Sequence, residues 1–311
     1  GSLDIKKLNG LMSYPSYSIL RQDLMSILEK RANELNIPIF YQHQVTGIKH
    51  ADSNCNTSVH FQNGLKIEPT VIVGADGRMK SFARQFVNGD NAPIYQGVIN
   101  WIGIYETSEH NFIHNPLSVM DYWGVGERFG IVPVSNTKAY WAGGVASKYI
   151  TENNPENYKE ELELLFSEWP TPIIDIIKNT QTKHINKIYL HDQDPIQTWH
   201  KENLVLLGDS AHSALPTSGQ GACQALEDAW HLALCLQEHT GNLEKAFQQY
   251  RSIRFDKTTS ITMSGRHLAT SIFNNDEAFC QQRNTVNKKM DYDAMAGGMA
   301  TLWSEGLPLN E

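Results

Sequence analysis

The chain has 311 residues, a formal net charge of −8, 41% hydrophobic residues and 19% charged residues. This composition excludes a disordered chain, which would be poorer in large apolar residues and richer in charge. The acidic balance argues against nucleic acid as a partner, because nucleic-acid binding needs a basic surface. The length predicts about two domains.

Cysteine usage and hydropathy indicate a reducing compartment and no membrane span. No CxxC pair and no histidine spacing typical of a metal site occurs, so we expect neither a disulfide framework nor a bound metal. The apolar runs are far shorter than the ~18 residues of a membrane helix, and no charged-then-apolar leader begins the chain. We therefore expect a cytoplasmic protein without an integral membrane segment. The four cysteines are Cys55, Cys223, Cys235 and Cys280.

The first predicted element is a helix. It follows an extended lead-in at residues 13–20. Apolar residues recur at helical spacing from Leu20 to Leu35, which predicts an amphipathic helix of about 16 residues that ends before Pro38.

Strands are predicted next. Residues 39–48 are a strand candidate, and the runs 58–61 and 65–67 flank Asn63-Gly64, which is a strong hairpin signal. The β-branched run 70–73 is typical of a short strand that is buried on both faces.

The middle of the chain has a different texture. Alternating, aromatic-rich runs between about residues 92 and 147 predict a mostly antiparallel sheet. Residues 155–169 and 172–179 are predicted to be helical, and residues 185–190 to form another strand.

The last third returns to an α/β pattern. Residues 204–207 predict a second buried strand, followed by a glycine-rich turn and a long helix over about 220–237. Helical structure is expected to continue to Arg266, and the tail to Glu311 to be less regular. This order favours one nucleotide-binding sheet interrupted by a central insertion over two domains in series.

Two strand endings carry residues suited to binding a ligand. Asp209 follows the strand 204–207, where it can accept hydrogen bonds from a sugar or ribitol hydroxyl. Small residues at the following helix start let a flat ligand approach, and the helix N-terminus favours its anionic atoms. An ordinary strand–loop–helix with glycines for tight packing explains the same pattern. Asp76 follows the earlier strand, where it can bind a ligand hydroxyl or cap the next helix.

Together these two segments resemble the internal signatures of the FAD-dependent aromatic hydroxylases, which are single-component flavoprotein monooxygenases. The first segment, 74–84, resembles the family's GADGxxSxxR pattern, and the second its GDAAH…P…GQGxxxAxEDA pattern. The second is matched almost throughout, by Gly208, Asp209, Ala211, His212, Pro216, Gly219, Gln220, Gly221, Ala225, Glu227, Asp228 and Ala229.

The resemblance covers nearly the whole chain and implies an α/β fold (α+β overall). It implies a Rossmann-like FAD-binding domain, here incomplete, with an inserted antiparallel-sheet substrate domain. The implied boundaries are 1–91 and 193–270 for the two parts of the FAD-binding domain, 92–192 for the insertion and 271–311 for the tail. The implied cofactor residues are Arg21, Val45, Asp76, Gly77, Gly208, Asp209, Pro216, Gly219, Gln220, Gly221 and Ala222. From the residues alone, Arg21 is an exposed arginine at a helix start.

The insertion most resembles the branch that includes urate hydroxylase, zeaxanthin epoxidase and salicylate-hydroxylase-like enzymes. Arg128 and Tyr140 match positions at which urate hydroxylase places an Arg and a Tyr beside its substrate. Arg128 could hold an anionic, electron-rich ring, and Tyr140 could donate to a ring oxygen or act as a base toward it. A hairpin arginine and a sheet-packing tyrosine are the plainer interpretations of these two residues.

Two departures from the family pattern stand out. Lys80 lengthens the first signature by one residue, so we do not assign Ser81 and Arg84 as cofactor contacts. No GxGxxG occurs, although in the family an opening βαβ unit with this motif cradles the pyrophosphate. Because the chain begins with Gly1 and not with Met, we expect it to start roughly one βαβ unit late and to leave a sheet edge exposed.

The resemblance implies oxygen transfer to a small molecule. In the family NAD(P)H transiently reduces FAD, O2 adds to the flavin, and the C4a-hydroperoxide hydroxylates or epoxidises an electron-rich aromatic, heteroaromatic or polycyclic substrate. A urate-like purine, a hydroxylated benzoate and an isoprenoid compound all remain open, as do NADH versus NADPH and the oligomeric state. The main alternative is a truncated, FAD-deficient remnant that acts as a binding protein. A flavin-dependent halogenase ranks below both, because Trp101 stands without the halogenase WxWxIP signature.

Overall fold

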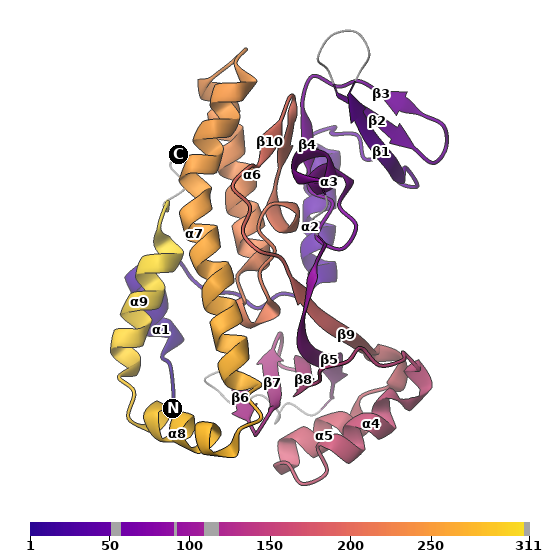
Figure 1. Cartoon of the computed structure of the whole chain (residues 1–311). Helices are drawn as coiled ribbons and strands as arrows, with labels where there is room; N and C mark the ends of the chain where they lie inside the picture. The colour runs from indigo at the N-terminus through magenta and orange to yellow at the C-terminus, as the bar shows by residue number, and fades with distance from the viewer. Residues whose placement is uncertain (51–56, 90–91, 109–117, 308–311) are drawn as a thin grey trace. The chain divides into compact units, whose positions relative to one another are not determined.

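The computed structural model describes residues 1–50, 57–89, 92–108 and 118–307 (Figure 1). Contacts divide the chain into two compact units. Unit 1 comprises Gly1–Pro38, Tyr95–Leu190 and Thr270–Gly298, and unit 2 comprises Ile39–Ile94, His191–Ala269 and Met299–Glu311. These units are defined by contacts, whereas the predicted FAD-binding and substrate domains are defined by the molecules they bind. The two predicted domains therefore stay predictions.

A five-stranded sheet lies at the centre of unit 1, in the order β6-β7-β8-β5-β9 (Figure 1). β5 pairs with β8, and β7 pairs with both β6 and β8, all antiparallel. The antiparallel sheet predicted for the middle of the chain is therefore confirmed. The strands are β5 (Ile94–Glu106), β6 (Met120–Trp123), β7 (Glu127–Pro133), β8 (Lys138–Ala146) and β9 (Ile185–Asp192).

One face of this sheet carries the core of unit 1. Side chains alternate along each strand, so Phe129 and Ile131 of β7 share a face with Trp141 of β8. All three are fully buried, and they pack with apolar residues of the two helices α4 (Tyr158–Leu165) and α5 (Thr171–Asn179). Both helices fall where the sequence predicted them.

Helices near the two ends of the chain depart from the prediction. The sequence analysis did not predict α1 (Ile5–Met12), which Asp4 caps by accepting from two backbone N–H groups. The prediction of a less regular tail was wrong, because α8 (Glu277–Lys288) and α9 (Tyr292–Ser304) form there. Asp276 caps α8 by accepting from the N–H of Phe279 at 2.8 Å.

The predicted amphipathic helix is present as α2 (Arg21–Glu34), but its apolar stripe is not buried. None of its residues is buried, and Ile27 is 58% exposed. Periodicity shows which residues share a face, and it does not show whether another element covers that face.

Unit 2 contains a three-stranded sheet in the order β10-β11-β4, formed by His200–Lys201, Leu204–Leu206 and Ile72–Gly74. β11 pairs with β4 in parallel and with β10 antiparallel. β11 is fully buried, as predicted. The prediction that β4 is buried on both faces was wrong, since Val73 is 45% exposed. Among the described residues no strand pairs with the edge of β4 that faces away from β11. This arrangement agrees with the predicted exposed sheet edge.

A second, small sheet in unit 2 contains the predicted hairpin. It has the order β1-β2-β3, formed by Val45–His50, Thr57–Phe61 and Lys66–Ile67. Asn63 Oδ1 accepts from the N–H of Leu65 at 3.0 Å, and Gly64 has a φ of +83°, as an Asn-Gly turn requires. The strand predicted at 39–48 begins only at Val45.

The helices of unit 2 include α3 (Phe82–Asn88), α6 (Gly221–Glu238) and most of α7 (Leu243–Ile272). Glycines let α3 and α6 approach the strand endings closely. A Cβ at Gly74 would lie 2.2 Å from the Cβ of Ala83 on α3, and a Cβ at Gly208 would lie 3.2 Å from the Cβ of Ala225 on α6. The same small-residue contact therefore joins strand end to helix in both strand–loop–helix segments.

Candidate functional site

The ending of β11 presents Asp209 to solvent. Gly208, directly before it, has a φ of +62°, a conformation that favours glycine. The backbone then forms a short 3-10 turn over Gly208–Ser210. The Asp209 side chain is 39% exposed, and its Oδ2 accepts from Arg78 Nη1 at 2.8 Å.

Arg78 joins the two predicted ligand-binding segments. It lies in the loop between β4 and α3, and its guanidinium reaches Asp209 after β11. Its Nε is buried and has no hydrogen-bond partner within the described residues. The sequence analysis did not assign Arg78, and its position directly after the Asp76-Gly77 pair is the signal that could have found it.

Asp76 caps α3. Its Oδ1 accepts from the hydroxyl of Ser81 at 2.6 Å and its Oδ2 from the N–H of Ala83 at 3.1 Å. Ser81 in turn accepts from the N–H of Arg84 at 2.8 Å. Asp76 therefore supports the start of α3 beside the N-cap residue Ser81, and its ligand-binding role stays a prediction. Gly77, beside it, has a φ of +78° and open space where a Cβ would stand.

Replacing Asp76 by Ala is expected to lower the free energy of unfolding by about 0.5–2 kcal/mol, the range measured for helix caps. Both carboxylate oxygens accept from the start of α3, and alanine offers neither bond. Urea unfolding would measure the change, with Asp23→Ala in exposed α2 as the control. An unfolding free energy equal to that of the wild type would contradict the capping role.

Arg84, which the sequence analysis left unassigned, has a structural role. It is 2% exposed and donates to the carbonyls of Ser210, Ala211 and Asp194 at 2.9–3.2 Å. Burial lowers the pKa of Arg84 to about 10. The guanidinium therefore fixes the loop that carries Asp209.

A buried network of charged side chains supports the same loop from α6 and α7. Asp228 is fully buried, and its Oδ2 accepts from the N–H of Gly208 at 2.9 Å and from His212 Nε2 at 2.5 Å. Its Oδ1 accepts from Arg254 Nε at 2.8 Å. Arg254 and Lys257 both donate to Glu227.

The charges in this network set the pKa of Asp228. Burial by itself raises it, but the attraction of His212 and Arg254 and the hydrogen bonds they donate outweigh burial and hold the pKa below its usual value. Asp228 is therefore ionised at neutral pH and anchors the turn at Gly208 with a full negative charge.

The start of α6 lies beside Asp209. The short 3-10 turn Pro216–Ser218 leads to Gly219, whose φ is +65° and whose Cβ position is open. A Cβ at Gly221 would lie 4.0 Å from Asp209 Oδ1. Gln220 and Ala222 flank this glycine, and no side chain caps the helix. The first N–H groups of an α-helix lack intrahelical partners, so this end can receive negatively charged atoms.

Two of the predicted cofactor residues belong to other elements. Val45 begins β1, where it pairs with Phe61. Arg21 begins α2 in unit 1, is exposed and makes no hydrogen bond to any described residue. The structure thus brings Gly208, Asp209 and Gly221 together, and the cofactor-binding roles of all the predicted residues, Val45 and Arg21 included, stay predictions.

The two predicted substrate residues lie on one face of the unit 1 sheet. Arg128 pairs with Gly144 across β7 and β8, and Tyr140 pairs with Val132, so both side chains face away from the buried core. The positive charge of Arg128 acts on Tyr140. Arg128 also donates to Asp121 through Nε at 2.7 Å and Nη2 at 3.0 Å, a bidentate ion pair that the sequence analysis missed.

The environment of Tyr140 favours its neutral form. Burial raises the pKa of Tyr140, and the nearby Arg128 only partly opposes this. Of the two roles considered for this phenol, donor and base, the raised pKa supports the donor.

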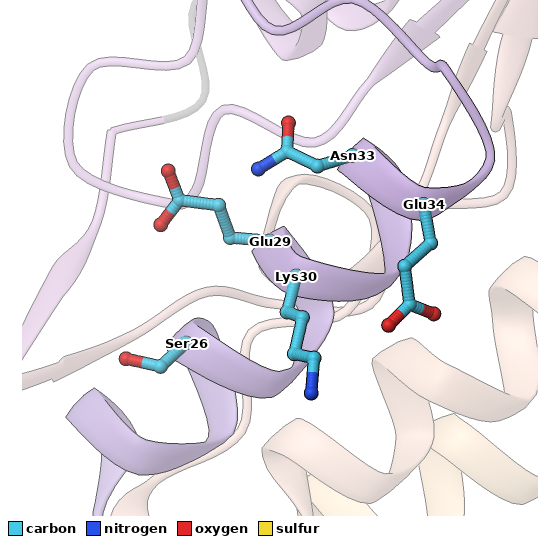
Figure 2. Close-up of a pocket in the computed structure, with 5 residues that line it drawn as sticks. All are labelled: Ser26, Glu29, Lys30, Asn33 and Glu34. Carbon is cyan, nitrogen blue, oxygen red and sulfur yellow. The ribbon is translucent and has the colours of Figure 1, made fainter.

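Figure 2 shows a shallow pocket on α2, lined by Ser26, Glu29, Lys30, Asn33 and Glu34. All five side chains come from one exposed helix, and none is a predicted cofactor or substrate residue. The pocket therefore adds no ligand-binding residue to the candidate site.

The described parts of the chain contain no group of His, Cys, Asp or Glu side chains that could hold a metal ion. None of their helices is long and apolar enough to cross a membrane.

Comparisons with known proteins relate the chain to FAD-binding enzymes. A family profile described as "FAD binding domain" matches residues 4–263. The chain is 30% identical over 293 residues to the aurachin C monooxygenase/isomerase of Stigmatella aurantiaca, covering 94% of this chain and 74% of that protein. It is 27% identical over 255 residues to the FAD-dependent urate hydroxylase of Mycolicibacterium vanbaalenii, covering 80% of this chain and 62% of that protein. The chain thus spans less than two thirds of this urate hydroxylase.

Among solved structures, Klebsiella pneumoniae HpxO in complex with FAD and uric acid has a TM-score of 0.87 to this chain. The match covers 98% of this chain and 77% of that chain at 23% identity, which shows a shared fold. The predicted α/β fold with an antiparallel sheet is thereby confirmed.

Proposed function

The chain belongs to the family of FAD-binding monooxygenases, and on that premise we propose that it acts as an FAD-dependent monooxygenase. The proposed reaction hydroxylates or epoxidises an electron-rich aromatic, heteroaromatic or polycyclic small molecule. NAD(P)H is the proposed transient reductant, and O2 supplies the oxygen atom. The urate hydroxylase among the relatives and the uric acid bound to HpxO support a small heteroaromatic substrate.

The observation that supports this function best is the cluster around Asp209. An exposed carboxylate, the uncapped start of an 18-residue helix and a guanidinium with an unpartnered Nε meet at the ends of β4 and β11. Ligands of α/β folds bind at such strand ends. The open Cβ positions at Gly77 and Gly219 leave room for a flat molecule, so the residues present fit FAD.

Each of these groups has a distinct role in the proposal. Asp209 accepts a hydrogen bond from a ribitol hydroxyl, and Arg78 donates to an anionic oxygen. The N–H groups at the start of α6 stabilise negative charge on the ring system. FAD supplies the redox chemistry, in which NAD(P)H reduces it and O2 reacts with the reduced form. Tyr140 positions the substrate by donating a hydrogen bond from its neutral hydroxyl.

Binding of FAD tests the proposal directly. The purified chain is expected to keep the two-band visible spectrum of a flavin after FAD is added and the solution desalted. Asp209→Ala is expected to weaken FAD binding about 10- to 100-fold, because a hydrogen bond to a charged group contributes about 1.5–3 kcal/mol. Isothermal titration calorimetry would measure the affinities, with Asp256→Ala, an exposed position on α7, as the matched control.

Two outcomes would contradict this proposal. Equal FAD affinity in the wild type and Asp209→Ala would remove Asp209 from the cofactor site. A folded, colourless chain that takes up no FAD would favour the alternative function, a binding protein without flavin. The exposed edge of β4 is the observation that keeps this alternative in view.

A further inference from the structure

Helix α7 approaches the turn before α6 at Gly265. This glycine is buried, and a Cβ there would stand 3.1 Å from the Cβ and 3.5 Å from the backbone N of Ser218. Ser218 belongs to the 3-10 turn Pro216–Ser218, which leads into the start of α6. Because Gly265 has no side chain, the backbone of α7 can lie directly against this turn.

A hydrogen bond holds the turn in this contact. The hydroxyl of Thr217, which is partly buried, donates to the backbone carbonyl of Gly265 at 2.7 Å. That carbonyl lies inside α7, where helical geometry gives it the N–H four residues later as a first partner, so Thr217 uses its second lone pair. A close contact and a hydrogen bond at the same residue therefore fix the turn to a long helix.

The turn determines which N–H groups the start of α6 offers. The N–H groups of Ser218, Gly219 and Gln220 all donate to acceptors within residues 215–218, at 3.0–3.3 Å. The next two N–H groups, those of Gly221 and Ala222, have no hydrogen-bond partner within the described residues. The position of the turn therefore sets where these two free N–H groups point.

The next residue of α7 holds a second loop of unit 2. Arg266 donates from Nε to Asp192 at 2.8 Å and from Nη1 to Asp194 at 2.9 Å. The carbonyl of Asp194 accepts from Arg84, which also holds the loop that carries Asp209. Two adjacent residues of α7 thus tie the turn before α6 and the loop after β9 to the same helix.

We propose that Thr217 and Gly265 are positioning residues of the cofactor site, which place the N–H groups of Gly221 and Ala222 where the flavin ring gains negative charge on reduction. This inference rests on the proposed function and adds a role for α7 in setting the redox potential of the cofactor. N–H dipoles stabilise the reduced, negatively charged ring more than the oxidised ring, so their position affects the equilibrium between the two. Both residues act through the backbone of the turn.

The first test needs no cofactor. Thr217→Val removes the hydrogen bond and keeps the shape of the side chain, whereas Thr217→Ser keeps the bond. In the full chain without FAD, amide hydrogen exchange at Ser218 and Gly219 is expected to become about three- to tenfold faster in Thr217→Val, because the turn loses one hydrogen bond. Thr217→Ser is expected to keep the wild-type rate. Thr285→Val, which removes a hydroxyl bond to the carbonyl of Gln281 on α8, is the matched control.

The second test measures the redox potential of bound FAD. A Cβ at Gly265 pushes the turn away from α7, and displaced N–H groups stabilise negative charge less well. Gly265→Ala is therefore expected to weaken the binding of reduced FAD about tenfold more than that of oxidised FAD, which lowers the two-electron midpoint potential by about 30 mV. Thr217→Val should shift the potential in the same direction. Gly297→Ala on α9, where a Cβ meets nothing within 4 Å, is the matched control.

The outcomes separate this proposal from the proposed function. A chain that binds FAD with the wild-type potential in Thr217→Val, or in a folded Gly265→Ala variant, would overturn the positioning role and leave the proposed function standing. Unchanged amide exchange in Thr217→Val would overturn it as well. A chain that takes up no FAD would overturn both proposals, and the exchange rates would still show whether Thr217 fixes the turn. If Gly265→Ala fails to fold, the potential of Thr217→Val decides.

Discussion

Asparagine in place of Asp228 is expected to lower the free energy of unfolding at neutral pH by about 3 kcal/mol. The carboxylate is fully buried and accepts hydrogen bonds from Gly208, His212 and Arg254. An amide has one acceptor oxygen instead of two and no charge, so Arg254 would keep only its bonds to Glu227 and Gln224. Urea unfolding followed by circular dichroism measures the loss.

The pH dependence of this loss has a definite sign. The pKa of Asp228 is lower in the folded chain than in the unfolded chain, so its stabilisation is present above about pH 4 and is lost as the pH falls through the folded value. The difference in stability between the wild type and Asp228→Asn should therefore shrink as the pH falls from about 7 to 3. Asp256→Asn, at an exposed position on α7, serves as control. A difference that stays constant or grows toward acid pH would rule out this role of the Asp228 charge.

Alanine in place of Gly74 is expected to destabilise the chain by about 2–3 kcal/mol, the upper part of the usual ~1–3 kcal/mol cost of overpacking a core. The added Cβ would stand 2.2 Å from the Cβ of Ala83, and neither atom can rotate away because both are fixed to the backbone. Helix α3 would have to shift. Thermal and urea unfolding measure the effect, and Gly47→Ala on β1, with nothing within 4 Å of the new atom, is the control.

A double-mutant cycle isolates the contact. Ala83→Gly removes the atom that the new Cβ meets, so the double variant should be more stable than the sum of the two single changes predicts. Ala83→Gly alone should cost about 1 kcal/mol, the helix-propensity difference between alanine and glycine. Additive single effects would show that strain elsewhere, and not this contact, destabilises the Gly74→Ala protein.

Local patterns predicted much of the fold. The alternating runs between residues 92 and 147 predicted the antiparallel sheet, and the Asn63-Gly64 turn located the hairpin of β2 and β3. Sequence patterns did not predict burial correctly where burial depends on which other elements pack against a helix or strand. Helix α2 has the predicted position, but none of its residues is buried, and Val73 on β4 is 45% exposed although its strand was predicted to be buried on both faces.

Helix α9 in the tail was not predicted because of two glycines in its own sequence. Gly297-Gly298 suggested a break, yet α9 runs through both glycines. Asp291 accepts from the N–H groups of Asp293 and Ala294 at 3.0 Å and so fixes the start of the helix. An N-terminal cap of this kind offsets part of the low helix propensity of glycine.

The candidate site was predicted in outline. The motif spacing identified Asp209 and the start of α6, which the structure places side by side. Two ion pairs were missed, because Arg78 and Asp209 are 131 positions apart and the Arg128–Asp121 pair depends on strand register. Spacing along one segment carries no information about contacts between segments.

The distance along the chain between β4 and β11 affects the order in which parts of the protein fold during synthesis. Arg78 and Asp209, beside these two strands, are separated by 131 positions, so a ribosome needs on the order of ten seconds to deliver the second after the first. The strands β5 to β8 are made within that interval and pair mostly with near neighbours, which favours rapid folding. We therefore expect the five-stranded sheet to begin folding first, while β4 waits with both edges open and depends most on chaperones during that interval.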